Sequence, residues 1–225
     1  LIVGDSTGFS FTEGLARASA DVFDVVSAAV AACPLVRAAL VSPAPGVDTA
    51  TDNCRSFDTD WRQLVADHDI DVIIAIDGLA EAWDQQRFAG DDWHEPGSVE
   101  YDEFHDSEMV AMQEVLAELG VPLLLADAPY VWPTQSIYGR ETERIDAWNA
   151  VIDRWDAAWP NVVELPFARW FSDPDTDAGR AERPDGVHIS NEFAERIAAE
   201  HLIAEIQAAY ARALAEMAET TTTQP

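Results

Sequence analysis

The first six residues, Leu1-Ile2-Val3-Gly4-Asp5-Ser6, decide how the rest of the chain is interpreted. Three apolar residues predict the end of a buried parallel strand, and Gly4 allows the backbone to turn sharply after it. Open α/β sheets bind their ligands at the carboxyl edge of the strands. Ser6 is therefore predicted at a binding edge, where its hydroxyl is either a nucleophile or the N-cap of the helix that follows.

A serine nucleophile needs a base, and the base needs a group that orients it. Near the other end of the chain, Arg183-Pro184-Asp185-Gly186-Val187-His188 places a carboxylate and an imidazole in one loop. A helix is predicted to begin near Ser190, just after this loop. We therefore predict a catalytic triad in which Asp185 orients His188 toward Ser6. Asp5, beside the nucleophile, is expected to bind loop amides rather than to take part in catalysis.

The two stretches together resemble the SGNH (GDSL-type) hydrolase superfamily, in which the serine follows Gly-Asp near the start and an Asp-x-x-His pair lies near the end. A finer resemblance is to SGNH domains fused to membrane acyltransferase-3 domains, which act on sugars of the bacterial envelope. It rests on Arg-Pro-Asp-Gly-Val-His, the early cysteine pair, an aspartate-tryptophan patch from Asp77 to Asp84, and Asn149. The resemblance implies the flavodoxin-like SGNH hydrolase fold and serine-dependent acyl chemistry without a cofactor.

The resemblance also implies an oxyanion hole, to which the amide of Ser6 contributes. The superfamily takes a second donor from a glycine after the second strand and a third from the asparagine of a Gly-x-Asn segment. The first location here reads Ala31-Ala32-Cys33-Pro34, where the amide of Ala32 or Cys33 could serve. The second reads Gly78-Leu79-Ala80, without the asparagine, and leaves Gly78 as the expected donor. These departures favour the acyltransferase-fused subgroup over a fast hydrolase.

Trp83, Asp84 and Trp93 follow the third predicted strand and should lie near the same edge as Ser6. They are candidates for substrate binding, by stacking on a sugar or packing an acyl chain, and ordinary loop packing is an equally open interpretation. His94 and His105 lie among acidic residues nearby. Their spacing matches no recognised metal-ligand pattern, so no metal site is predicted.

Strands and helices alternate along the chain, which predicts a three-layer α/β/α sandwich around a parallel five-stranded sheet. The first expected strand ends at Gly4, and the other four span residues 21–26, 70–76, 121–126 and 162–165. The expected helices span residues 12–20, 57–67, 101–119, 141–159 and 192–217, with 28–40 either a helix or a loop, and 42–53 and 128–138 as loops. Residues 1–217 should form a single domain, followed by a flexible tail, 218–225.

The composition limits the possible partners. The chain has 42 acidic residues against 13 basic ones, a net charge of −29, and no lysine. Such a surface repels nucleic acid and anionic lipid, so nucleic acid is not expected as a partner. A solvated acidic face explains the charge better than a site for a cationic ligand. No run of about 18 apolar residues is present, so no membrane-spanning segment is predicted.

The two cysteines, Cys33 and Cys54, are either a disulfide or two buried thiols, and the residues alone leave both open. The family resemblance favours the disulfide, because related extracytoplasmic domains carry cysteines at similar places. A disulfide would indicate an oxidising compartment. We therefore expect a location on the periplasmic or cell-surface side of the membrane, or secretion.

The leading hypothesis is an O-acyl esterase or acyltransferase that acts on acyl, chiefly acetyl, esters of an envelope or extracellular glycan through an acyl-enzyme on Ser6. The sequence opens inside a strand without a methionine, so we expect it to be part of a longer protein. The family resemblance implies two forms of that protein: a fusion with a membrane acyltransferase domain upstream, or a secreted esterase with a signal peptide. The domain itself is expected to be monomeric. The alternative is a catalytically weak or inactive carbohydrate-binding module of an envelope-modifying protein.

Overall fold

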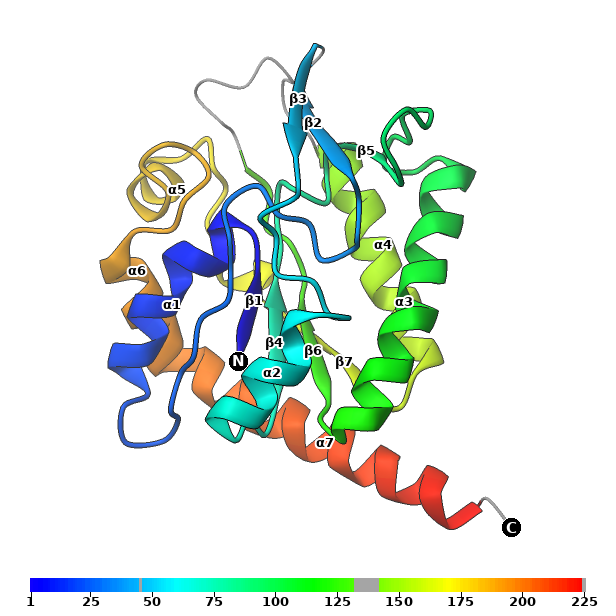
Figure 1. Ribbon diagram of the computed structural model, residues 1–225. Coiled ribbons are helices and arrows are strands. Elements are labelled where there is room, and N and C mark those ends of the chain that lie inside the picture. Colours follow the sequence, from blue (N-terminus) through cyan, green and yellow to red (C-terminus); the bar gives the residue numbers. More distant parts are fainter. Residues whose placement is uncertain (45, 132–141, 224–225) are drawn as a thin grey trace.

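The computed structural model describes residues 1–44, 46–131 and 142–223, and its central layer is a parallel sheet (Figure 1). Four strands pair in the order β1-β4-β6-β7. They span Ile2–Gly4 (β1), Ile73–Ile76 (β4), Leu123–Ala126 (β6) and Val162–Leu165 (β7). Their last residues, Gly4, Ile76, Ala126 and Leu165, are in register with one another. The four strands therefore end together at one carboxyl edge.

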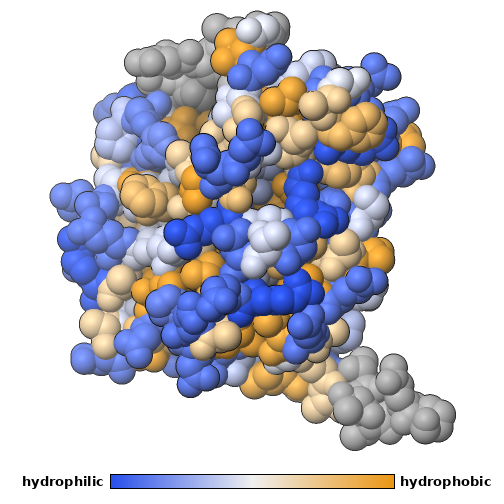
Figure 2. All heavy atoms as spheres, in the orientation of Figure 1, coloured by the Kyte–Doolittle hydropathy of each residue, from blue (hydrophilic) through white to orange (hydrophobic). Residues whose placement is uncertain are grey.

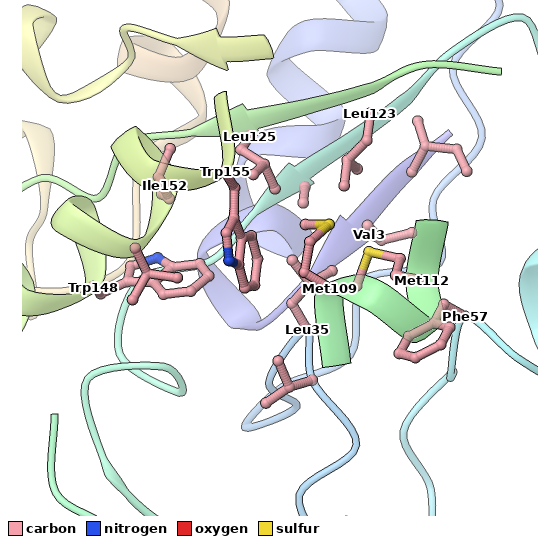
Figure 3. Close-up of a cluster of buried hydrophobic side chains, with 14 of the residues drawn as sticks. Val3, Leu35, Phe57, Met109, Met112, Leu123, Leu125, Trp148, Ile152 and Trp155 are labelled. Atoms are coloured by element: carbon pink, nitrogen blue, oxygen red, sulfur yellow. The ribbon is translucent and has the colours of Figure 1, made fainter. Parts of the chain in front are cut away.

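Helices cover both faces of this sheet. One face carries α1 (Ser6–Ala18), α6 (Asn191–Ile197) and α7 (Ile203–Thr223), with a π-helical turn, Ala198–Leu202, between the last two. The other face carries α2 (Asp60–His68), α3 (Val99–Leu119) and α4 (Thr142–Ala158). Alternate strand residues face two hydrophobic cores: Ile74 and Leu124 face α1 and α6, while Ile73 and Leu123 face α3 and α4 (Figure 3). The predicted three-layer α/β/α architecture is confirmed.

The sheet has four strands in the described part of the chain rather than the predicted five. The missing strand is residues 21–26, where the backbone turns at its start because the amides of Val22 and Phe23 both donate to Ser19 O. The following residues still run along β1. Ile2 N donates to Val26 O and Val30 N to Gly4 O, but a single bridge, between Ile2 and Ser27, meets the geometry of a strand. An irregular segment therefore occupies the edge position beside β1.

A second, antiparallel sheet was not predicted. It consists of β2 (Leu40–Ala44), β3 (Val47–Ala50) and β5 (Asp84–Gln86), in the order β3-β2-β5. In Figure 1 this sheet stands beyond the carboxyl ends of the parallel strands. Residues 42–53 were expected to form a loop because they contain prolines and a glycine, and these residues make the hairpin instead.

A disulfide joins Cys33 and Cys54, with 5.4 Å between the two Cα atoms. This pairing confirms the prediction that came from the family resemblance. The loop that it closes contains the whole β2–β3 hairpin. The disulfide therefore fixes the end of the hairpin, at Cys54, to Cys33, which follows the irregular segment that runs beside β1.

The remaining helices differ from the prediction mainly at their ends. The first begins at Ser6 instead of Thr12, residues 28–40 form no helix, and the last continues past Met217 to Thr223. A short helix, α5 (Asp177–Glu182), and a 3-10 turn, Ala168–Trp170, precede the predicted catalytic loop. Most of the predicted loop 128–138 lies outside the described residues.

The surface is mixed. Hydrophilic side chains cover much of the face in Figure 2, with smaller hydrophobic patches between them. In the ranges that the structure describes, no helix has the length and apolar character needed to cross a bilayer.

Candidate active site

Ser6 lies in the turn between β1 and α1, at the carboxyl edge of the sheet. The turn requires glycine at position 4, because Gly4 has a φ of +118° and a Cβ there would lie 2.3 Å from Ile76 O. Gly8 has a similar role one turn later, since its Cβ would lie 2.9 Å from the same oxygen. These two glycines bring the amino end of α1 directly against the end of β4.

Asp5, and not Ser6, caps this helix. Its Oδ1 accepts a hydrogen bond from Thr7 N at 2.7 Å, and its Oδ2 accepts from Gly78 N at 3.3 Å and Ala80 N at 3.1 Å. Asp5 thus has the structural role expected for it, and the interpretation of Ser6 as the N-cap is wrong. The partly exposed Ser6 hydroxyl makes no hydrogen bond within the described chain, so it is available to a substrate.

Asp185 and His188 form a hydrogen-bonded pair in the loop between α5 and α6. His188 Nδ1 lies 2.6 Å from Asp185 Oδ2, while Asp185 Oδ1 accepts from Val187 N at 2.9 Å and His188 N at 2.7 Å. Partial burial raises the pKa of Asp185, but the hydrogen bonds from the His188 ring and the two amides outweigh it and hold the pKa below the usual value. The carboxylate therefore stays ionised and can hold the proton of Nδ1 in place.

The loop that carries Asp185 and His188 is anchored to the helix that begins with Ser6. Ile189 N donates to Ser10 Oγ at 3.3 Å, and Ser10 is one helical turn beyond Ser6. Further along, a Cβ on Gly14 would lie 2.5 Å from the Cβ of Ala194, so α1 and α6 pack in close contact. In the described residues no hydrogen bond joins the Ser6 hydroxyl to the His188 ring. Catalytic hydrogen bonds are often long without substrate and shorten when it binds.

Two backbone amides near Ser6 are free to bind an oxyanion. The Ser6 amide lies ahead of the first helical hydrogen bond, which runs from Phe9 N to Asp5 O. The Ala32 amide makes no hydrogen bond within the described chain, and the bond from Val30 N to Gly4 O places its loop beside the nucleophile turn. Of the two alternatives considered for the second donor, the Cys33 amide is occupied, because it donates to Val30 O at 3.2 Å.

The third predicted donor is directed elsewhere. Gly78 N and Ala80 N both point to the buried carboxylate of Asp5. Gly78 could serve an oxyanion only by giving up that hydrogen bond. Ala80 stands where the superfamily has asparagine, so this segment offers no side-chain donor either.

The predicted substrate-binding residues lie around β5. Asp84 Oδ1 is 2.7 Å from Arg144 Nη2 on α4, and Trp83 packs against the core with part of its surface exposed. Trp93 is 38% exposed and therefore has a ring available to a ligand. No hydrogen bond or ion pair joins these three residues to the Ser6 turn in the described chain. Their role in binding stays a prediction.

Asp77 is a buried acid that the sequence interpretation named only as the start of the aspartate-tryptophan patch, without giving it a role. It directly follows Ile76, the last residue of β4, and is 2% exposed. Within the described chain, neither of its carboxyl oxygens has a hydrogen-bond partner. Burial, followed by the nearby charges of Asp5 and Glu81, raises the pKa of Asp77 well above its usual value. A carboxyl residue directly after an apolar strand run was the sequence signal for it.

Two further side chains hold loops at the same edge. Arg183 is 1% exposed and donates to Tyr130 O at 2.6 Å and to Ser172 O at 2.8 Å. Asn149, on α4, exchanges two hydrogen bonds with the backbone of Ala128, at 2.8 and 3.0 Å. These contacts give structural roles to the arginine of the Arg-Pro-Asp-Gly-Val-His motif and to the helical asparagine. No group of three or more potential metal ligands occurs in the ranges that the structure describes.

Comparison with known proteins gives the family of this chain. The family model described as "SGNH domain (fused to AT3 domains)" matches residues 1–202. The chain belongs to this SGNH family. No curated protein sequence matches the SGNH domain at a significant level.

Solved structures share the fold of the SGNH domain at low sequence identity. A Streptococcus pneumonia protein provisionally described as a platelet activating factor has a TM-score of 0.58 and 15% identity, covering 92% of this chain and 81% of that one. A GDSL-like lipase from Bacteroides thetaiotaomicron has a TM-score of 0.55 and 12% identity, covering 92% and 87%. A Bacteroides fragilis protein provisionally described as an acylhydrolase has a TM-score of 0.54 and 12% identity, covering 92% and 86%. Family membership supports esterase or acyltransferase activity in general.

Proposed function

We propose that this SGNH domain is a serine-dependent O-acyl esterase or acyltransferase that acts on acyl, chiefly acetyl, esters of an envelope or extracellular glycan. The observation that carries the proposal is the 2.6 Å hydrogen bond between Asp185 and His188, in a loop anchored beside the Ser6 turn. A structural loop histidine has no need of a carboxylate on Nδ1, whereas a general base gains its tautomer and orientation from one.

The reaction would proceed through an acyl-enzyme. Ser6 Oγ attacks the acyl carbonyl while His188 Nε2 accepts the hydroxyl proton, and the amides of Ser6 and Ala32 bind the developing oxyanion. His188 then gives the proton to the leaving alcohol oxygen as the acyl bond breaks. Water or a sugar hydroxyl, deprotonated by His188, attacks the acyl-enzyme, and the imidazolium returns this proton to Ser6 Oγ as its bond to the acyl group breaks. Asp185 stabilises the imidazolium in both halves of the reaction.

The glycan substrate and the location are supported less directly. The family model describes SGNH domains fused to AT3 domains, the disulfide favours an oxidising compartment, and Trp93 offers an exposed ring for a sugar. The side chains of His188 and Asp185 are 47% and 51% exposed, which suits a bulky acyl acceptor better than a small ester enclosed in a pocket.

The test uses covalent labelling together with turnover. The purified domain and its Ser6→Ala variant are incubated with a fluorophosphonate probe and with p-nitrophenyl acetate, and then with acetylated polysaccharides while released acetate is measured. We expect label on Ser6 and turnover that the variant lacks. Absence of both in the wild-type domain would refute an active serine enzyme.

A second candidate is a carbohydrate-binding module without catalysis. The observation that favours it is the engagement of the Gly78 and Ala80 amides by Asp5, which leaves the oxyanion hole with fewer donors than the superfamily pattern. Glycan binding by calorimetry, unchanged in the Ser6→Ala variant and without probe labelling, would select this candidate.

A further inference from the structure

A buried pair of polar side chains lies next to the segment that carries the Ala32 amide. The side chains of Glu81 and His105 are both fully buried, with 2.8 Å between Glu81 Oε2 and His105 Nε2. The other ring nitrogen, Nδ1, lies 2.9 Å from Tyr101 O, which can only accept a hydrogen bond. Nδ1 therefore donates to that carbonyl, and Nε2 faces the Glu81 carboxyl group.

Both oxygens of the Glu81 side chain accept hydrogen bonds from neighbouring groups. Its Oε1 accepts from Leu35 N at 2.6 Å and Val36 N at 3.3 Å, and its Oε2 accepts from Gln85 Nε2 at 2.8 Å and faces His105 Nε2. A buried carboxyl group with these partners is fully satisfied.

Aromatic rings surround His105. The His105 ring lies 3.8 Å from the Tyr101 ring, centroid to centroid, and 5.7 Å from that of Trp148. A buried pair of this kind is often no better for stability than apolar residues of the same volume. Stability alone therefore gives no reason for the pair. The hydrogen bonds that Glu81 accepts from the amides of Leu35 and Val36 indicate a different role, in holding this segment in place.

Those hydrogen bonds fix one end of the loop that presents Ala32. Leu35 also points its side chain into the core between the sheet and α3, as Figure 3 shows. The other end of the loop is fixed by the bond from Val30 N to Gly4 O. Between the two anchors Ala32 has a φ of +60°, a left-handed conformation that costs a residue with a Cβ roughly 1–2 kcal/mol. Such a conformation persists only where the surroundings enforce it.

We propose that Glu81, held in place by His105, is a positioning residue for the oxyanion hole and keeps the free amide of Ala32 directed at the reacting carbonyl. The inference rests on the proposed function, because an oxyanion hole has a role only in acyl transfer. Glu81 follows Ala80, the position at which this chain lacks the superfamily's asparagine. The segment after β4 thus supports a backbone donor on the neighbouring loop instead of supplying a side-chain donor.

The test compares turnover in variants of the pair. Glu81→Gln replaces one carboxylate oxygen by an NH₂ group. This group would face either Gln85 Nε2 or the amides of Leu35 and Val36, which are all donors, so hydrogen bonds of the network are lost. We expect kcat for p-nitrophenyl acetate to fall at least tenfold with KM within twofold of wild type, since loss of a whole oxyanion donor costs about 10²–10³ in kcat. The double variant Glu81→Gln/His105→Asn should be no worse than Glu81→Gln within twofold, because the two residues act as one unit.

A control separates this role from a general loss of stability. Ile206 is 3% exposed in the core on the opposite face of the sheet, and Ile206→Ala should lower the melting temperature of the domain because it leaves a cavity. Its kcat should stay within twofold of wild type at a temperature where circular dichroism shows every variant folded. A Glu81→Gln variant with wild-type kcat, or an equal loss of kcat in Ile206→Ala, would overturn the proposal.

Hydrogen exchange keeps the proposal testable if the domain proves inactive. Exchange in the peptide that contains residues 30–36 should be faster in Glu81→Gln than in wild type, and unchanged in Ile206→Ala. Unchanged exchange in Glu81→Gln would overturn the positioning role whatever the activity. A third outcome is faster exchange in Glu81→Gln together with a wild-type domain that takes no probe label. This result would refute the proposed function, and with it the catalytic consequence, while supporting the role of Glu81 in holding the loop.

Discussion

Replacing Asp185 by asparagine tests the catalytic assignment most sharply. The carboxylate divides its contacts: Oδ1 accepts two backbone amides, those of Val187 and His188, and Oδ2 faces His188 Nδ1. An asparagine has a single side-chain oxygen. In the Oδ1 position this oxygen keeps two hydrogen bonds, whereas in the Oδ2 position it would keep one. Its NH₂ group then faces Nδ1, which must become an acceptor, so the ring proton moves to Nε2. His188 would be held in the tautomer that cannot take the proton of Ser6.

The expected loss follows from this change of tautomer. Turnover should fall by up to roughly 10⁴, which corresponds to about 5.4 kcal/mol of transition-state stabilisation at 1.36 kcal/mol per tenfold. The free energy of unfolding should change by less than about 1 kcal/mol, because the side chain is 51% exposed and the loop keeps its backbone contacts. The substitution thus separates catalysis from folding.

The assay measures kcat with p-nitrophenyl acetate for the wild type, Asp185→Asn, Ser6→Ala and the double variant, with circular dichroism as a folding control. The Ser6→Ala and double variants should be equally inactive, since residues of one catalytic unit do not add their losses. A fall of less than about threefold in Asp185→Asn would show that Asp185 is a turn residue and would refute the triad.

Three further outcomes concern the stability of the fold around the site. Asp77→Asn should gain stability relative to wild type as pH rises above about 4. The raised pKa of Asp77 means that the folded state keeps a proton that the unfolded state releases above about 3.9, so the stability of the wild type falls as pH rises. Urea titrations at several pH values measure this, and parallel stability curves for the two proteins would contradict it. Replacing Cys33 and Cys54 by serine should cost about 3 kcal/mol in the chain-entropy model, or roughly 6–12 °C in Tm by calorimetry, and an unchanged Tm would contradict it. Gly4→Ala should destabilise by at least about 1–3 kcal/mol because its Cβ would meet Ile76 O, and a variant as stable as wild type in denaturant would be inconsistent with the tight turn.

The parts of the fold that were predicted correctly are those with a strong local signal. β4 and β6 are buried on both faces, so their apolar runs are unbroken and easy to recognise. The strand β3 is exposed along nearly its whole length, and β2 contains Pro43, so neither shows the apolar pattern of a strand. β2 also pairs with β5, which is distant in sequence and carries three polar residues.

The same distinction holds at the site. Asp185 and His188 are three residues apart, and their hydrogen bond could be anticipated from the motif. The selection of Ala32 over Cys33 could not, because it depends on which amide the loop leaves unoccupied. The contact between Glu81 and Leu35 joins residues 46 positions apart and becomes visible only when the chain is folded.

The anchor between Ile189 and Ser10 spans 179 positions of the chain, nearly its full length. During synthesis the nucleophile turn emerges first, and the base follows only when almost the whole domain has been made. A nascent, clipped or prematurely terminated chain therefore contains the proposed nucleophile without its proposed base. Under the proposed triad, the domain gains esterase activity only when α6 docks against α1 and the loop of His188 is anchored beside the Ser6 turn.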